Sequence, residues 1–146
     1  MENLENILFY NIEKSIRSYR NFSQQKLRKN QFPISIDQWL ILKTLEQYPT
    51  ITQNKIGMIV FKDNATITRL IDQSVNAGII EKMPNLEDRR RAYLEITEGG
   101  YHLLDRIQNI INKNREVALN GITMEEISMI NSALKKISNN CINAKI

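Results

Sequence analysis

The stretch that decides the fold is Ala65–Thr97, which reads ATITRLIDQSVNAGIIEKMPNLEDRRRAYLEIT. Its first part has the apolar spacing of a short helix, and Gly78 then supplies the left-handed backbone at which many helices end. Its last part alternates apolar and polar residues, as a half-buried strand does. Three consecutive arginines stand before that strand. The stretch therefore predicts a short helix followed by a β-hairpin with a basic tip.

The expected helix, residues 64–77, has two different faces. Asp63 suits the N-cap, because its carboxylate can accept hydrogen bonds from the free amides of the first turn. The side that should face the core carries Ile67, Leu70, Ile71 and Ser74. The opposite side carries Ala65, Arg69, Asp72, Gln73 and Asn76, with Thr66 and Thr68 on the flanks. Such small and hydrogen-bonding groups can approach base edges and phosphates. An ordinary amphipathic surface helix is the alternative interpretation.

The expected hairpin consists of strands 80–84 and 91–97, with Arg89, Arg90 and Arg91 at or near its exposed tip. Such a tip can enter the narrow minor groove, where the negative potential is strongest. Asp88 would repel phosphate, but it can orient a neighbouring arginine through a charge-assisted hydrogen bond. A helix for the major groove beside this hairpin is typical of a winged helix-turn-helix DNA binder. A merely solvated run of charges is the alternative.

The segment from Ile34 to Gly100 resembles the MarR (multiple antibiotic resistance regulator) family of bacterial transcription regulators. The matching landmarks are Ser35–Leu42, Ile51–Gln53, Ile56–Gly57, Thr66–Asp72, Gly78–Lys82, Asp88–Arg90 and Ile96–Gly100. Two positions depart from the family pattern: Gly57 stands where Ala is usual, and Ser74 where Leu is usual. Both departures suggest a loosely packed DNA lobe.

The proline and glycine residues that separate the periodic segments predict a mostly α fold with a small β-hairpin wing (α+β). Further helices are expected at 3–29, 36–47, 53–60, 98–119 and 124–142. We expect one MarR-like domain over residues 1–146, with the winged helix lobe at 34–100 and helical dimerisation regions at 1–33 and 101–146. The outer helices carry more apolar surface than so small a lobe can cover, so they should pack across a two-fold axis. A monomeric helical bundle is the alternative; the resemblance implies the dimer.

The candidate DNA-binding residues are Thr52, Gln53, Asn64, Ala65, Thr66, Thr68, Arg69, Gln73, Arg89, Arg90 and Arg91. A two-fold dimer would place two such sets about 34 Å apart on double-stranded DNA, which predicts a pseudo-palindromic operator. The resemblance implies a repressor that a small aromatic or anionic effector releases from DNA. Candidate wall residues of the effector pocket are Tyr10, Tyr19, Trp39 and Tyr48, although aromatic residues at helical spacing are also common in plain cores.

Composition and the absence of certain motifs limit the classes of function that the sequence suggests. The net charge is +4, but residues 34–100 hold eight basic and nine acidic side chains, so the local arginine cluster carries the argument for DNA. The acidic N-terminus and the lack of a long apolar run favour a cytoplasmic protein without a membrane partner. No phosphate loop or nucleophile elbow occurs, so no enzyme is expected. A winged-helix protein–protein adaptor that binds no DNA stays open as an alternative.

The single cysteine and the single histidine argue against redox or metal chemistry. Cys141 lies on an apolar stripe with Ile127, Ile130, Leu134 and Ile137, and we expect it to be a small buried hydrophobe. A cysteine-based redox-sensing regulator is the alternative. His102 has no neighbours at metal-ligand spacing, so neither a metal site nor another cofactor is expected.

Overall fold

The structure is a computed structural model that describes residues 1–146. Its elements are a 3-10 helix η1 (Leu4–Asn6), α1 (Leu8–Lys29), α2 (Ile36–Gln47), α3 (Gln53–Val60), α4 (Asn64–Asn76), β1 (Ile80–Pro84), β2 (Ala92–Ile96), α5 (Glu98–Ala118) and α6 (Met124–Asn143). The predicted fold class, a mostly α chain with a hairpin wing, is confirmed. Most predicted boundaries agree to within a residue or two.

The main difference from the prediction is at the N-terminus, where the expected helix 3–29 is divided into two elements. The side chain of Asn3 accepts a hydrogen bond from the backbone N–H of Glu5 and caps a separate 3-10 turn. Ile7 is extended, with φ −84° and ψ 115°, and α1 begins only after it. Across the break, the side-chain amide of Asn11 donates a 2.8 Å hydrogen bond to the carbonyl of Glu5, which holds the 3-10 turn to the start of α1.

The predicted helix starts are confirmed by their caps. Ser35 and Gln38 form a reciprocal capping box at α2, and Thr123 and Glu126 form another at α6. Thr52 accepts from the backbone N–H of Lys55 at the start of α3. These side chains satisfy amides that have no partner inside their own helices, and so they fix where each helix begins.

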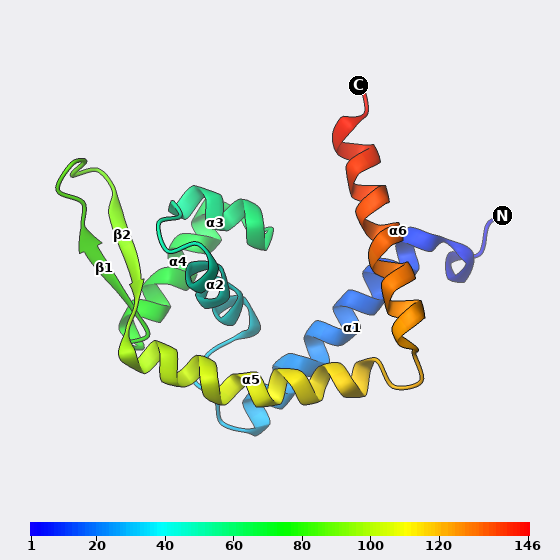
Figure 1. Cartoon of the computed structure of the whole chain (residues 1–146), viewed down its shortest axis with the longest axis horizontal. Coiled ribbons are helices and arrows are strands. Elements are labelled where there is room, and N and C mark those ends of the chain that lie inside the picture. Colours follow the sequence, from blue (N-terminus) through cyan, green and yellow to red (C-terminus); the bar gives the residue numbers. More distant parts are fainter. The chain divides into compact units, whose positions relative to one another are not determined.

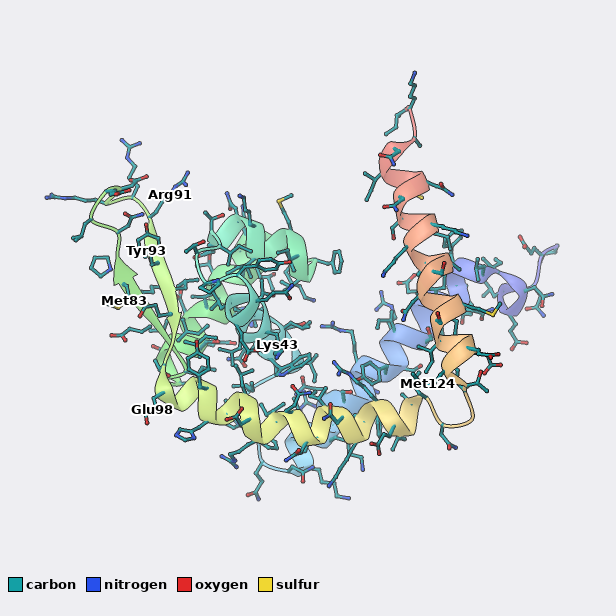
Figure 2. The ribbon with its side chains drawn as sticks, viewed as in Figure 1. Lys43, Met83, Arg91, Tyr93, Glu98 and Met124 are labelled. Atoms are coloured by element: carbon teal, nitrogen blue, oxygen red, sulfur yellow. The ribbon has the colours of Figure 1, made fainter.

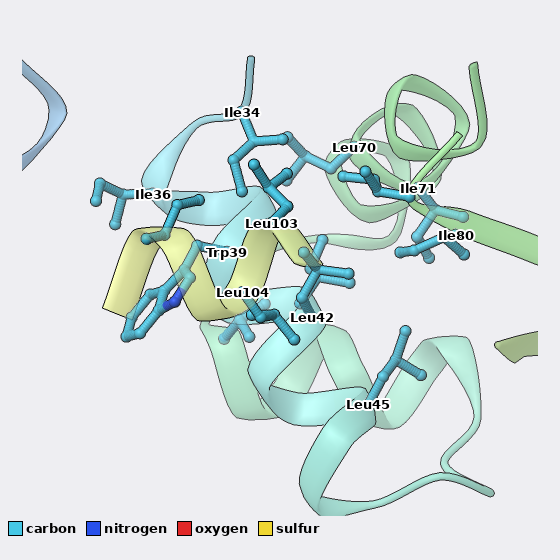
Figure 3. Close-up of a cluster of buried hydrophobic side chains, with 14 of the residues drawn as sticks. Ile34, Ile36, Trp39, Leu42, Leu45, Leu70, Ile71, Ile80, Leu103 and Leu104 are labelled. Atoms are coloured by element: carbon cyan, nitrogen blue, oxygen red, sulfur yellow. The ribbon is translucent and has the colours of Figure 1, made fainter. Parts of the chain in front are cut away.

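The chain packs as two compact units, Met1–Asn114 and Arg115–Ile146. The first unit contains the hydrophobic core, which α2 and α4 share with the base of the hairpin and with α5. Figure 3 shows the centre of this core, with side chains that include Ile34, Trp39, Leu42, Leu70, Ile71, Ile80, Leu103 and Leu104. The core extends beyond the predicted lobe at both ends, to Leu27 on α1 and Ile111 on α5.

The expectation of loose packing at the two unusual positions is wrong. A Cβ atom on Gly57 would lie 2.9 Å from the carbonyl oxygen of Lys62, so the turn after α3 packs directly on the glycine. Ser74 is fully buried, and its Oγ accepts a 3.2 Å hydrogen bond from Nε2 of Gln38 while donating to the carbonyl of Leu70. Hydrogen bonding there replaces the apolar contact that a leucine would make.

The hairpin projects away from α2, α3 and α4, with its turn at the free end (Figure 1). Strands β1 and β2 pair antiparallel, from Ile80 opposite Ile96 to Pro84 opposite Ala92. Gly78 has φ +74° and directly follows the C-cap of α4, so the helix ends there as predicted. The hydroxyl of Thr97 donates a 2.6 Å hydrogen bond to the Gly78 carbonyl, which closes the base of the hairpin on the end of α4.

The outer helices leave much apolar surface uncovered in the single chain. Leu4, Leu8 and Ile16 are exposed, and α6 has no buried residue. Cys141 is exposed as well, so the expectation of a buried cysteine is wrong for the chain alone. The reason is that no other element of its own unit covers the apolar stripe of α6. None of the helices is long and apolar enough to cross a membrane.

Candidate nucleic-acid interface

Helix α4 presents the two faces that its sequence predicts. Ile67, Leu70, Ile71 and Ser74 are the buried residues of the helix. Ala65, Thr68, Arg69, Asp72, Gln73 and Asn76 are exposed, together with Asn64 at its first position. Thr66 is half-buried. The exposed face therefore offers amide, hydroxyl and guanidinium groups on a helix whose other face is anchored in the core, which is what reading a groove requires.

Asp63 fixes the start of α4. Its Oδ1 accepts a 2.7 Å hydrogen bond from the backbone N–H of Thr66. This bond, with smaller help from the Thr66 side chain and the charge of Lys62, holds the pKa of the Asp63 carboxyl below its ordinary value. The carboxylate thus stays ionised and keeps the first turn of the helix closed.

Two predicted contact residues on different helices are joined to each other. Nε2 of Gln53, at the start of α3, donates a 2.8 Å hydrogen bond to Oγ1 of Thr68 on α4. The bond leaves the Thr68 hydroxyl proton free to be donated to a phosphate or a base edge, and the Gln53 side-chain oxygen free to accept from a base edge. The two helices thereby present one hydrogen-bonding surface.

A carboxylate on the exposed face of α4 is neutralised by the wing. Oδ1 of Asp72 lies 2.8 Å from Nζ of Lys82 on β1. Asp72 stands one turn from Arg69, where an unpaired negative charge would repel a phosphate backbone. The sequence places Asp72 on the exposed face of α4 but does not indicate its partner, because the pair joins residues ten positions apart on two different elements.

Two side chains hold the hairpin turn, the amide of Asn85 and the carboxylate of Asp88. Oδ1 of Asn85 accepts from the backbone N–H groups of Glu87 and Asp88. Asp88 in turn accepts a 3.0 Å hydrogen bond from the backbone N–H of Arg90, and its Oδ2 lies 3.7 Å from Nε of Arg91. The sequence predicts a charge-assisted hydrogen bond from an arginine side chain to Asp88; the structure shows a backbone hydrogen bond from Arg90 and a longer ion pair with Arg91.

The arginines lie at the free end of the hairpin. Figure 2 shows Arg91 near the tip, beyond Met83 and Tyr93 along the strands, while Glu98 lies at the base. Arg89, Arg90 and Arg91 are all exposed, as is Arg69 on α4. Arg69, Arg89 and Arg90 form no ion pair. Their guanidinium groups are therefore available to an external anion.

A cavity of about 530 Å³ lies in the first unit among α1, α2 and the end of α3. Its lining includes Ile16, Arg20, Leu40, Lys43, Tyr48 and Phe61. Of the four aromatic residues predicted to form a ligand pocket, the structure brings only Tyr48 to this cavity. Trp39 belongs to the hydrophobic core, and Tyr10 and Tyr19 lie elsewhere on α1.

A group of three charged side chains near the cavity is not predicted by the sequence pattern. Asp37, in the first turn of α2, forms ion pairs with Arg20 of α1 and with Lys62, which follows α3. In the sequence, Asp37 is notable only as part of the stretch Ser35–Leu42 that resembles the MarR family. No periodicity signals that residues 20, 37 and 62 meet, since each lies on a different element.

The helices α2, α3 and α4 with the hairpin β1–β2 form a winged helix-turn-helix lobe. Residues 34–92 match the MarR family. The resemblance drawn from the sequence is therefore confirmed over this lobe.

Solved structures of MarR-type regulators have the same fold as nearly the whole chain. A cysteine-to-serine mutant of MarR from E. coli, complexed with operator DNA, matches with a TM-score of 0.80 and 21% identity, over 89% of this chain and 92% of that chain. MepR from S. aureus, in a DNA complex, matches with a TM-score of 0.80 and 21% identity, over 92% and 98%. BpsR from Bordetella bronchiseptica, whose DNA binding is regulated by 6-hydroxynicotinic acid, matches with a TM-score of 0.84 and 15% identity, over 99% of each chain. At these identities the likeness shows the fold.

Proposed function

We propose that this protein is a sequence-specific, DNA-binding transcription regulator without enzymatic activity. The observation that carries the proposal is the exposed polar face of α4 beside a wing whose tip bears three exposed arginines. The helix would read base edges in the major groove, and the wing would contact the minor groove. The DNA complexes of the fold's relatives support this use of the lobe. Acting on bacterial chromosomal DNA would place the protein in the cytoplasm.

The assigned contacts differ in what they would contribute. Arg69 would pair bidentately with a guanine and so supply sequence discrimination. Thr52 and Gln53 at the start of α3 would hold phosphates, as would Asn64 and Thr66 at the start of α4. Ala65, Thr68 and Gln73 complete the reading surface of the helix. Arg89, Arg90 and Arg91 would add affinity with little discrimination between sequences.

We further propose a homodimer built from the terminal helices, in the role of a repressor that a small molecule releases. The exposed apolar residues of α1 and α6 support the dimer, because monomeric proteins rarely leave such extended apolar faces open. The cavity beside α1 has the size that small organic ligands occupy. An aromatic or anionic effector would fit its mixture of apolar, aromatic and basic lining.

A gel-shift titration tests the proposal, using the DNA upstream of the protein's own gene at two salt concentrations. We expect saturable binding at low salt that falls steeply as salt rises, because phosphate contacts release counterions. Arg89→Ala combined with Arg90→Ala should weaken binding strongly. Arg17→Ala is the matched control, since Arg17 lies on α1 and pairs with Glu13 far from the assigned contacts in sequence.

Failure to bind any upstream or random duplex at low salt would contradict DNA binding. That result would favour the winged-helix adaptor, which has the same lobe but meets a protein. The three unpaired arginines at and near the reading surface argue against the adaptor, because guanidinium groups concentrated there suit a polyanion.

A further inference from the structure

The hydrogen bond between Gln53 and Thr68, on the surface that is proposed to face DNA, has a defined direction. Nε2 of Gln53 donates to Oγ1 of Thr68, so the threonine hydroxyl accepts in this contact, and no group of the chain accepts its proton. Thr44, inside α2, instead donates its proton to the carbonyl of Leu40 one turn earlier. The proton of Thr68 is therefore available to an acceptor outside the chain.

The surroundings of the pair leave it open to a duplex. Thr68 is exposed, and Gln53 is half-buried. The residues one turn before Thr68 on α4, Asn64 and Ala65, are exposed and short, so a base edge has room beside the hydroxyl. A phosphate at the start of α3 would be held by main-chain amides, which leaves the side chain of Gln53 for another partner.

The hydrogen bond also restricts two groups that would otherwise rotate. A hydroxyl turns about its C–O bond, and a glutamine side chain has several rotatable bonds. Because the two groups hold each other before DNA arrives, less conformational entropy is lost when they bind it. The resulting surface offers one acceptor, Oε1 of Gln53, and one donor, the hydroxyl of Thr68.

We propose that Gln53 and Thr68 together recognise one adenine in the major groove. Adenine presents a donor at N6 and an acceptor at N7, which the acceptor and the donor of the pair satisfy together. Guanine presents two acceptors, cytosine a donor alone, and thymine an acceptor beside a methyl group, so each leaves one group of the pair unmatched. This assignment rests on the proposed function and adds to it a base that the lobe selects.

Base analogues test the assignment with the full chain. Selection from a pool of random duplexes first gives the preferred sequence, and each adenine in it is then replaced. 7-Deazaadenine lacks the N7 acceptor, and purine lacks the N6 amino group. At one of these adenines, we expect each analogue to weaken binding of the wild type by roughly five- to a hundredfold in anisotropy titrations. If neither analogue weakens binding at any adenine, the proposal is overturned.

Thr68→Val removes the donor and keeps the shape of the side chain. We expect this variant to bind the natural duplex as weakly as the wild type binds the duplex with 7-deazaadenine. The analogue should then cause no further loss in the variant, because the two changes remove the same hydrogen bond. A further loss of the same size would assign N7 to another side chain and overturn the role of Thr68.

Gln53→Glu changes the base that the pair fits. The new carboxylate only accepts, so Thr68 would donate its proton to it, and the pair would offer acceptors alone. Selection with this variant should replace the assigned adenine with cytosine, whose N4 amino group is a donor. A bond that only holds α3 against α4 would affect all sequences alike, so an unchanged preference for adenine would contradict the proposal.

Gln108→Glu is the matched control for the added charge. Nε2 of Gln108 donates a 2.9 Å hydrogen bond to Oδ1 of Asn112 within α5, outside the assigned DNA contacts. The control variant should keep the wild-type preference for adenine. Loss of this preference in both glutamate variants would trace the change to charge alone and overturn the assignment.

The outcomes separate this inference from the proposed function. A chain that binds its selected duplex and discriminates through Arg69, but shows no effect of either adenine analogue, would contradict the adenine assignment alone. A chain that enriches no sequence and binds no duplex at low salt would contradict the proposed function, and the adenine assignment with it.

Discussion

Asp72 on the recognition helix and Lys82 on the first strand of the wing form an ion pair of 2.8 Å. The pair spans the two elements that are proposed to enter adjacent grooves, and it cancels the one acidic charge on the exposed face of α4. Both side chains are about half exposed, at 52% and 46%, so the pair should add little to stability. Its effect should be seen in binding instead.

Lys82→Gln should therefore weaken DNA binding by roughly threefold or more at low salt, because the Asp72 carboxylate then faces the phosphates without its partner. The free energy of unfolding should hardly change. Adding Asp72→Asn should restore most of the affinity, as measured by fluorescence anisotropy. If the double variant binds as weakly as Lys82→Gln, then Lys82 contacts DNA itself and the neutralising role is wrong.

Substitutions of Arg69 and Arg90 should weaken DNA binding in different ways. Arg69→Ala should remove on the order of 1–3 kcal/mol of discrimination at one base pair. Arg69→Lys should not rescue it, because lysine lacks the bidentate fork. Arg90→Ala should weaken binding to all sequences alike and reduce the slope of log affinity against log salt by about one. Titrations of single-base operator variants would check both, and an Arg90→Ala loss confined to one base pair would count against the wing assignment.

The position of Gly57 gives a prediction about stability. A methyl group there would meet the backbone carbonyl of Lys62 at 2.9 Å, and a backbone atom cannot move aside as a flexible side chain can. Gly57→Ala should lower the free energy of unfolding by about 1–3 kcal/mol, measured by urea denaturation. A neutral or stabilising effect would show that the turn between α3 and α4 yields easily.

Two buried serines should respond in opposite ways to loss of the hydroxyl. Ser74→Ala leaves the buried amide of Gln38 with one partner fewer, which should cost about 1–3 kcal/mol of the free energy of unfolding. Ser23→Ala is the control, because the Ser23 hydroxyl is buried and already has no hydrogen-bond partner. Its removal should be neutral or stabilising. Equal losses from both variants would contradict a specific role for the Gln38–Ser74 bond.

The N-cap of α4 predicts a pH dependence. The Thr66 amide lowers the pKa of Asp63 in the folded chain below the ordinary value of 3.8, so the folded state favours the carboxylate. Its stabilising effect is then complete above that value and is lost as pH falls through the folded pKa. Relative to Asp63→Asn, the wild type should lose stability progressively in acid. The loss caused by Thr52→Ala should stay the same at every pH, since that N-cap does not titrate; a parallel pH dependence would contradict the assignment.

Local features of the sequence predicted much of this structure. The apolar spacing of Ile67, Leu70 and Ile71 found the buried side of α4, and Ser35 and Thr123 marked where two helices begin. These predictions succeed because neighbours in sequence decide caps and amphipathic faces. The helical spacing does not predict the break at Ile7, where the side chain of Asn11 bonds the carbonyl of Glu5 six positions earlier.

The candidate site, like the fold, could be predicted only where neighbours in sequence determine it. The exposed face of α4 and the arginine tip follow from periodicity and turn signals, so the predicted contact residues lie together on one lobe. The pairs Asp72–Lys82 and Arg20–Asp37 join different elements, and nothing in the spacing of one element encodes its partner. The four aromatic residues predicted as pocket walls do not line one cavity of the single chain. Trp39 fills the core, and the cavity formed where only Tyr48 of the four lies.

The bare apolar stripe of α6 has a further consequence. A helix of 20 residues without a fully buried side chain gains little stability from packing within its own unit. If it is completed by a second copy, its order obeys mass action, whereas the lobe has a core of its own. Dilution would then unfold α6 while the winged helix-turn-helix lobe stays folded. A cell could silence such a protein simply by making less of it.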